Sequence, residues 1–140
     1  MNRKSKKPRP SEKSYSHVPL LDKLGVKPES RAAVLKISDA AFLDQLRKRA
    51  NDISLFRPLG NSDLIFLGVE SKSDLKKLSS LRSRLKSNGA IWVVYPKGVE
   101  HIRETDVRAA ALVSGLVDVK IVSFSGTHTA LKLVIPLAQR

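Results

Sequence analysis

Two continuous apolar runs constrain the fold of this chain more than any other feature. Residues 64–69 read LIFLGV and residues 90–95 read AIWVVY, and neither run alternates apolar with polar positions. Such runs are typical of strands in a parallel sheet that is covered on both faces. The sequence therefore predicts two central strands at these positions.

Segments with helical periodicity flank these runs. Residues 40–50, 74–86 and 105–113 place apolar side chains at the spacing of an amphipathic helix. Ser73 is the expected N-cap of the second helix, and the Asn88-Gly89 pair is its expected end. Each apolar run is thus predicted to be followed by a helix.

Shorter β-rich segments complete the pattern. Strands are expected at residues 32–37, 117–124 and 129–135, with a turn between the last two, and a further short strand at residues 53–56. Helices that alternate with buried strands predict an α/β fold. We expect a three-layer, Rossmann-like, mostly parallel sheet with an antiparallel hairpin at its C-terminal end.

The first 17 residues differ in composition from the rest. They contain two prolines, almost no apolar side chain and one acid, together with six basic residues: Arg3, Lys4, Lys6, Lys7, Arg9 and Lys13. Such a stretch cannot bury enough surface to fold alone. We predict a disordered basic tail at residues 1–17 and a single domain at residues 18–140.

The net charge is +13, and eight of these charges lie outside the tail. Such a field attracts polyanions, so nonspecific nucleic acid or an acidic protein is the expected partner, with solubility alone as the alternative. The tail and two basic helix faces are the predicted contact surfaces, and the helix residues are Arg47, Lys48, Arg49, Lys76 and Lys77.

The expected cellular location is the cytoplasm. The chain has no cysteine and no apolar run of the length of a signal peptide or a membrane span. The oligomeric state does not follow from the sequence.

No catalytic or metal site is predicted. Absence of cysteine excludes thiol nucleophiles and thiolate zinc sites. His101 stands near Glu100 and Glu104, but this segment fits a solvated loop better than a metal site. Thr127 and His128 fall in the expected hairpin turn, which favours small polar residues without any catalytic role.

One crevice is the expected ligand site. Tyr95 and Lys97 follow a predicted central strand, and Thr105 and Asp106 begin the next helix. Open parallel sheets bind ligands at the carboxyl ends of their strands, and helix N-termini bind anions. We predict that these four residues hold an anion or a phosphate-bearing ligand.

Three stretches resemble the skeleton of a class I methyltransferase: LGVKPE at residues 24–29, SDLIF at residues 62–66 and NGAIWVV at residues 88–94. More narrowly, the chain resembles a bacterial family of short proteins called domain of unknown function three thousand and fifty-two. The matching stretches are LLDKLGVKP (20–28), WVVYPK (92–97), GLVDVK (115–120) and ALKLV (130–134). The resemblance spans roughly residues 18–136 and implies a fold, not an activity.

The chain departs from that skeleton where the cofactor would bind. Methyltransferases place a glycine-rich turn after the first strand, whereas residues 37–42 read ISDAAF. Residues 53–57 read ISLFR and end without the acid expected for the ribose, so Asp39 or Asp52 would have to replace it. We therefore expect no cofactor, with S-adenosylmethionine disfavoured.

These observations favour a non-enzymatic binding or interaction module on a degenerate methyltransferase-like fold, with polyanion contact through basic surfaces. Two alternatives stay open. One is an enzyme or small-molecule or nucleotide binder that uses the crevice near Tyr95 and Lys97, and the other is a subunit that needs a protein partner.

Overall fold

The computed structural model describes residues 18–140, so the predicted tail at residues 1–17 lies outside the described residues. Six strands form one sheet in the order β2-β1-β3-β4-β6-β5. They are β1 (Arg31–Leu35), β2 (Asp52–Ser54), β3 (Ser62–Gly68), β4 (Leu85–Pro96), β5 (Val117–Ser123) and β6 (His128–Val134). The first four are parallel, and β6 runs antiparallel to both β4 and β5. The predicted mostly parallel sheet with a C-terminal hairpin is confirmed.

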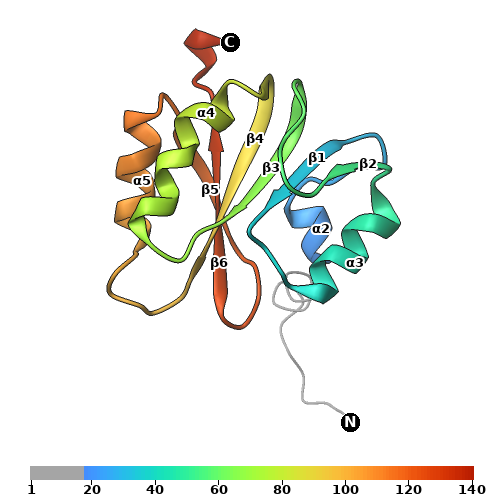
Figure 1. Ribbon diagram of the computed structural model, residues 1–140, viewed down its shortest axis with the longest axis horizontal. Coiled ribbons are helices and arrows are strands. Elements are labelled where there is room, and N and C mark those ends of the chain that lie inside the picture. The colour runs from blue at the N-terminus through green and yellow to red at the C-terminus, as the bar shows by residue number, and fades with distance from the viewer. Residues whose placement is uncertain (1–17) are drawn as a thin grey trace.

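Helices cover both faces of this sheet (Figure 1). On one face lie α2 (Leu20–Lys23) and α3 (Ala40–Arg49), which pack against the same side of β1, β3 and β4. On the other face lie η1 (Lys72–Lys77), α4 (Leu78–Arg82) and α5 (Glu104–Val113). A short turn of helix, η2 (Leu137–Gln139), ends the chain. The three layers of the predicted α/β fold are all present.

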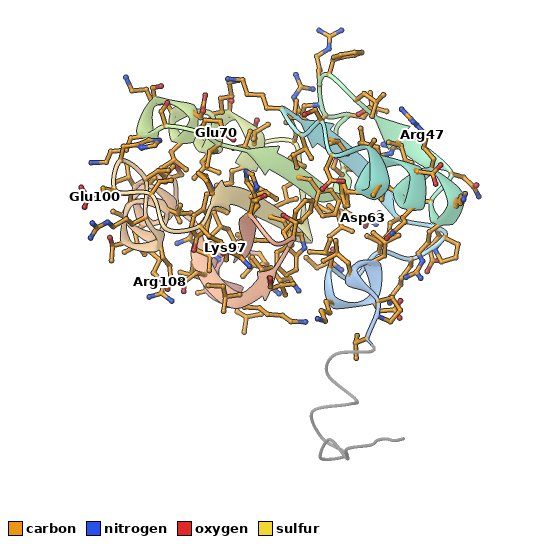
Figure 2. All side chains as sticks on the ribbon, turned by 90° about the horizontal axis from the view of Figure 1, so that it is seen from below. Arg47, Asp63, Glu70, Lys97, Glu100 and Arg108 are labelled. Carbon is orange, nitrogen blue, oxygen red and sulfur yellow. The ribbon has the colours of Figure 1, made fainter. Side chains whose placement is uncertain are left out.

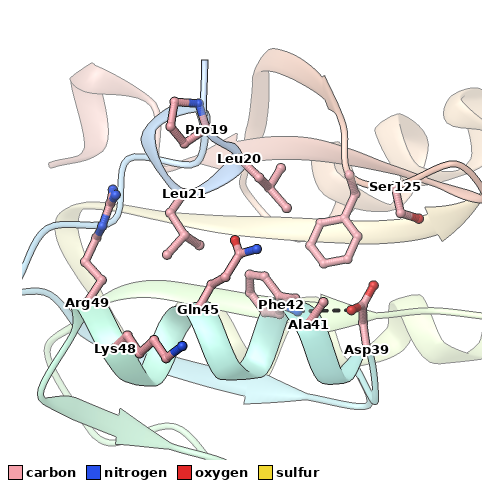
Figure 3. Close-up of a pocket in the computed structure, with 11 residues that line it drawn as sticks. Pro19, Leu20, Leu21, Asp39, Ala41, Phe42, Gln45, Lys48, Arg49 and Ser125 are labelled. Carbon is pink, nitrogen blue, oxygen red and sulfur yellow. Dashed lines mark hydrogen bonds between the residues drawn. The ribbon is translucent and has the colours of Figure 1, made fainter. Parts of the chain in front are cut away.

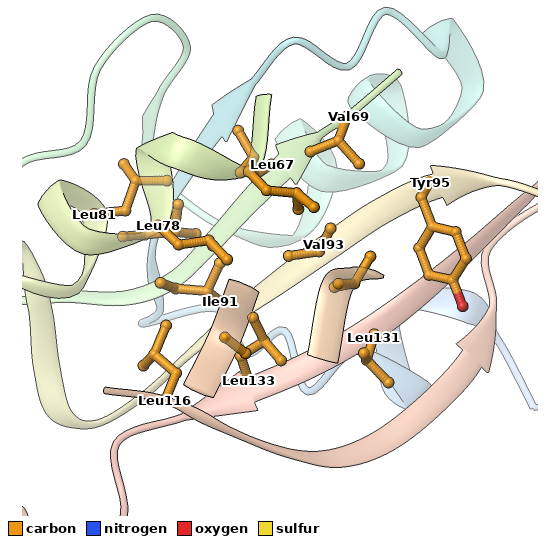
Figure 4. Packing of buried hydrophobic residues seen from close by; sticks show 14 of the residues in the cluster. Leu67, Val69, Leu78, Leu81, Ile91, Val93, Tyr95, Leu116, Leu131 and Leu133 are labelled. Atoms are coloured by element: carbon orange, nitrogen blue, oxygen red, sulfur yellow. The ribbon is translucent and has the colours of Figure 1, made fainter. Parts of the chain in front are cut away.

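The two apolar runs form β3 and β4, whose side chains point alternately into the two halves of the core. Ile65 and Leu67 face η1, α4 and α5, whereas Phe66 and Trp92 face α2 and α3. Figure 4 shows the first of these clusters, in which Leu67, Leu78 and Leu133 are fully buried. Burial on both faces explains why neither run alternates polar with apolar positions.

The helix predicted at residues 74–86 is wrong in its second half. The segment begins as η1, capped by Ser71 and not by Ser73, and helical structure ends at Arg82. The following residues, including the expected stop at Asn88-Gly89, belong to β4, where Leu85 pairs with Ser62. A Cβ on Gly89 would lie 2.8 Å from the carbonyl oxygen of Asp63, so this glycine permits a close strand crossing and does not end a helix.

Within residues 18–140, no helix combines the length and the apolar composition that crossing a bilayer requires.

Candidate functional site at the carboxyl edge of the sheet

The chain leaves the neighbouring strands β1 and β3 in opposite directions. From β1 it goes to α3 on one face, and from β3 it goes to η1 on the other. Ligands of open α/β sheets bind in the crevice at such a switch point. A cavity of about 260 Å³ lies there, which we call the switch-point cavity. Its lining residues come from the loop after β1, the ends of β3 and β4, the segment after β3 and the β5–β6 connection. They include Lys36, Asp39, Gly68, Glu70, Val94, Phe124, Thr127 and His128.

The loop after β1 passes directly over the end of β3. A Cβ built on Gly68 would lie 2.2 Å from the carbonyl oxygen of Lys36, so this contact requires glycine. Lys36 itself has a φ of +60°, in the left-handed region that costs a non-glycine residue about 1–2 kcal/mol. Backbone strain of this kind persists where the surrounding structure enforces it, and it is frequent at binding sites.

An ion pair crosses the crevice and ties the two loops together. Lys36 Nζ lies 2.8 Å from Asp74 Oδ1, and Asp74 Oδ2 accepts hydrogen bonds from the backbone amides of Glu70 and Ser71. The hydrogen bond from Lys36 and those from the two amides lower the pKa of Asp74, and the same pair raises the pKa of Lys36. Both groups are therefore charged at neutral pH, and they hold the walls of the cavity in place.

Two carboxylates line the switch-point cavity. Asp39 caps α3, and its Oδ1 accepts a hydrogen bond of 3.0 Å from the Phe42 amide. Glu70 Oε2 lies 3.5 Å from His128 Nε2, while His128 Nδ1 contacts Thr127 Oγ1 at 2.8 Å. Both carboxylates keep acceptor sites that could bind hydroxyl or ammonium groups of a ligand.

Thr127 lies in the hairpin turn, as predicted, and His128 is the first residue of β6. Ser125 Oγ accepts hydrogen bonds from both of their amides. No sequence pattern predicted that these two residues also form a wall of the switch-point cavity.

A second cavity of about 700 Å³ adjoins the first, between α2, α3 and the β5–β6 turn (Figure 3). We call it the α2–α3 cavity. It shares Asp39 and Phe124 with the switch-point cavity. Leu20 and Leu21 form much of its apolar wall, and Lys48 and Arg49 lie at its edge. The two cavities together have the size that a drug-sized ligand needs.

The four residues of the predicted anion site do not all line one hollow. Tyr95 and Lys97 line a hollow of about 440 Å³, where Lys97 Nζ donates to Ser123 Oγ at 2.8 Å. Burial and the charge of Glu104 raise the pKa of the Tyr95 phenol, and Arg108 opposes them.

Thr105 and Asp106 do not line this hollow. Asp106 Oδ2 instead accepts from the Arg103 amide, and its Oδ1 lies 3.7 Å from Lys72 Nζ. The structure therefore brings two of the four predicted residues together.

The predicted basic helix faces lie on opposite sides of the sheet. Arg47, Lys48 and Arg49 end α3, whereas Lys76 and Lys77 end η1 on the other face. Figure 2 shows Arg47 far from Arg108, which lies on the face of η1. These residues do not form one continuous surface, and the five predicted contact residues of the tail (Arg3, Lys4, Lys6, Lys7 and Arg9) lie outside the described residues.

Over the described chain, from residue 18 to residue 140, no group of three or more metal-binding side chains comes together. His101 Nε2 contacts the carbonyl oxygen of Glu70 at 2.9 Å.

Of the two acids that could replace the missing ribose ligand, only Asp39 is at the carboxyl edge. Asp52 begins β2 at the opposite edge and pairs with Arg31 at 2.8 Å. Gly68 and Glu70 were not predicted as site residues. The rule that ligands bind at the carboxyl ends of strands nevertheless applies to them, since Gly68 ends β3 and Glu70 follows the run at residues 64–69.

No family model matches the sequence and no curated protein matches it significantly, so membership of the domain-of-unknown-function family stays a prediction. Solved structures do match. An S-adenosylmethionine-dependent methyltransferase from Aquifex aeolicus aligns with a TM-score of 0.65 at 14% identity, over 93% of this chain and all of that one. An S-adenosylmethionine-dependent O-methyltransferase from Thermotoga maritima aligns with a TM-score of 0.64 at 9% identity, over 96% of this chain and 68% of that one.

A third structure is magnesium protoporphyrin IX methyltransferase from Synechocystis with bound SAH. It aligns with a TM-score of 0.54 at 12% identity, over 89% of this chain and 83% of that one.

These matches contradict the expectation of no cofactor with S-adenosylmethionine disfavoured, because two of the matching structures are S-adenosylmethionine-dependent methyltransferases and the third holds SAH. The expectation rested on one loop without glycine and one strand without a final acid. A cavity nevertheless exists at the switch point, and Gly68, Asp39 and Glu70 are among the residues that line it. Residues 18–140 therefore have the fold of class I methyltransferases.

Proposed function

We propose that residues 18–140 bind S-adenosylmethionine in the switch-point cavity and act as a methyltransferase domain. The observation that carries this proposal is the position of the cavity, at the switch point of a methyltransferase-like sheet, with the carboxylates of Asp39 and Glu70 in its wall. The fold match over nearly the whole chain supports it.

The residues present suit the chemical groups of this cofactor. Carboxylates accept hydrogen bonds from ribose hydroxyls and from the ammonium group, and Asp39 and Glu70 provide two of them. Val94 and Phe124 give the cavity apolar walls. The adjoining α2–α3 cavity offers the further room that the cofactor or a methyl acceptor needs.

When bound, the cofactor supplies an electrophilic methyl group. The protein would contribute binding and orientation. Asp39 and Glu70 would fix the polar groups, Val94 and Phe124 would exclude water, and the Lys36–Asp74 ion pair would keep the two loops at their spacing.

Calorimetric titration and thermal unfolding with S-adenosylmethionine test this proposal. A ligand at one hundred times its Kd stabilises the folded state by about 2.7 kcal/mol, which is a rise in Tm of roughly 10 °C for a domain of this size. We expect Asp39→Asn and Glu70→Gln to weaken binding by about tenfold each, because a hydrogen bond to a charged group is lost.

Asparagine also caps helices, so Asp39→Asn should keep α3 intact. The matched control is Asp44→Asn on the same helix, which is exposed, lines neither cavity and should bind like the unchanged protein. If the unchanged protein shows neither heat nor a Tm shift with the cofactor, the proposal is wrong.

A second proposal is that the protein is a binding module that contacts polyanions through its basic surfaces, as the sequence predicts. The charge of +13 and the exposed Arg47 and Lys48 at the end of α3 favour nonspecific contact with nucleic acid or another polyanion. Retention on a nucleic-acid column should fall as salt rises, and it should weaken when residues 1–17 are deleted. Retention that is independent of salt would exclude this proposal.

The hollow beside Tyr95 and Lys97 stays a proposed anion site, which Lys97→Gln should weaken in a phosphate titration.

A further inference from the structure

Lys132 stands on an apolar face of the sheet. It lies in β6 between Ala130 and Val134, whose side chains share its face and belong to the buried cluster around Trp92. Its Nζ lies over the Trp92 ring, 6.0 Å from the ring centre, at the outer limit of a cation–π contact. A lysine in the middle of such a face gives up hydration that an exposed lysine keeps.

Nothing in residues 18–140 compensates Lys132 with a negative charge. No carboxylate within this part of the chain forms an ion pair with it, and the cross-strand neighbour is another cation, Lys120. Burial and the charge of Lys120 both lower the pKa of Lys132. Lysines that are desolvated or placed beside another cation are the ones that act as nucleophiles, because more of the amine is neutral.

Lys132 also lines a large groove, of about 710 Å³, on the side of the molecule away from the switch-point cavity. Lys27, Lys86 and Arg140 line the same groove, against the two acids Glu29 and Asp63. Asp63 is already engaged by Lys86 and by the Arg31 amide. The groove therefore has an excess of positive charge, which attracts anions.

We propose that Lys132 is a nucleophilic lysine that acyl phosphates acylate after they enter this groove. The cations would attract the phosphate group, and the neutral amine of Lys132 would attack the carbonyl carbon. The carbon–nitrogen bond forms, the bond from the carbonyl carbon to the phosphate oxygen breaks, and phosphate leaves with the electron pair. The proton that the amine loses passes to solvent, and the product is an N-acyl lysine. This inference does not depend on cofactor binding at the carboxyl edge.

Acetyl phosphate is the probe, and peptide mass spectrometry measures the acetylated fraction of each lysine over time. We expect Lys132 to react at least about threefold faster than Lys48, which is exposed and paired with Asp44. Unfolding in guanidinium should remove this preference, since it arises from the folded environment. Equal rates for the two lysines in the folded protein would overturn the proposal.

Two further measurements separate the contributions of the groove and of the amine. Pyrophosphate should compete with acetyl phosphate and slow the reaction of Lys132 while leaving that of Lys48 unchanged, and failure to compete would refute the role of the groove. Lys120→Ala should slow acetylation of Lys132 by a neutral acetyl ester, because the pKa of Lys132 rises when the neighbouring charge is removed. An unchanged rate in this folded variant would refute the predicted nucleophilicity.

Discussion

The two edges of the sheet are built in different ways. At the amino edge, Arg31 is a centre of hydrogen bonding: its amide donates to Asp63 at 2.8 Å, and its side chain donates to Asp52 at 2.8 Å and to the Gly60 carbonyl at 2.7 Å. At the carboxyl edge, the backbone is strained at Lys36, two cavities open and the carboxylate of Glu70 is exposed.

This difference indicates a division of roles. Groups at the amino edge satisfy one another, so they fix the start of β1, β2 and β3 relative to each other. Groups at the carboxyl edge retain unused acceptors beside a cavity, which is typical of a site that binds something else. Substitutions at Asp52 and Asp63 should therefore act on stability, and substitutions at Asp39 and Glu70 should act on binding.

The largest expected effect is that of Gly68→Ala. The new methyl group would collide with the backbone carbonyl of Lys36, so the end of β3 or the loop must move, at a cost of about 3 kcal/mol in the free energy of unfolding. Urea unfolding measures it. Gly126→Ala in the β5–β6 turn is the control, because a Cβ there meets no atom within 4 Å, and it should change stability by less than about 0.5 kcal/mol. Similar values for both variants would show that the close contact does not exist.

Asp63→Ala should come next, with a loss of about 2 kcal/mol, because the amide of Arg31 loses its acceptor. Asp44→Ala, which removes an exposed pair within α3, should cost about 0.5 kcal/mol or less. Equal losses would contradict the contrast between a structural edge and an exposed helix surface.

The contribution of Asp63 should depend on pH. Partial burial raises its pKa, but the hydrogen bonds from the Arg31 amide and Lys86 lower it, and the net pKa lies below the ordinary value of 3.8. A carboxyl group with a lowered pKa stabilises the folded state above the pKa of the unfolded chain, and this stability is lost as the pH falls through the folded pKa. The gap between the unchanged protein and Asp63→Ala should therefore be full at pH 6 and should shrink below about pH 4. A gap that widens in acid would refute the sign of this shift.

The smallest expected effects concern the two non-glycine residues with a positive φ, Lys36 at the carboxyl edge and Asn61 at the amino edge. Asparagine tolerates the left-handed region better than lysine, so Lys36→Asn should slightly stabilise the protein, because the strain that it relieves outweighs the half-exposed pair with Asp74 that it removes. Asn61, beside the start of β3, has a φ of 59°, so the opposite substitution, asparagine to lysine, can be made there. Asn61→Lys should destabilise by about 0.5–1 kcal/mol. The same sign for the two exchanges, measured by thermal unfolding, would show that backbone strain does not decide them.

The sequence predicted the sheet better than the site. Runs such as residues 64–69 report burial on both faces directly, and helical periodicity identified α3 and α5. Periodicity failed at Leu85, because a leucine there is buried whether the chain is helical or extended. The role of Gly89 depends on Asp63, a residue far away in the sequence, so no local pattern could reveal it.

The candidate site depends on contacts of the same long-range kind. Glu70 and His128 lie far apart in the sequence, and the approach of Lys36 to Gly68 joins the loop after β1 to the end of β3. A search for one glycine-rich loop could not detect a crevice that two strands and a hairpin turn form jointly. The prediction that Tyr95 and Lys97 lie together is correct, because they are neighbours in sequence at the end of one strand.

The length of β4 has a consequence for how the molecule folds. This 12-residue strand bonds to β3 in the parallel part of the sheet and to β6 in the antiparallel part. The β5–β6 hairpin involves contacts that are close in sequence and can form early, whereas the parallel pairs must close long loops. Docking of β4 then links the two parts, so we expect hydrogen exchange to show a single cooperative opening in which amides of β3 and β6 are released together.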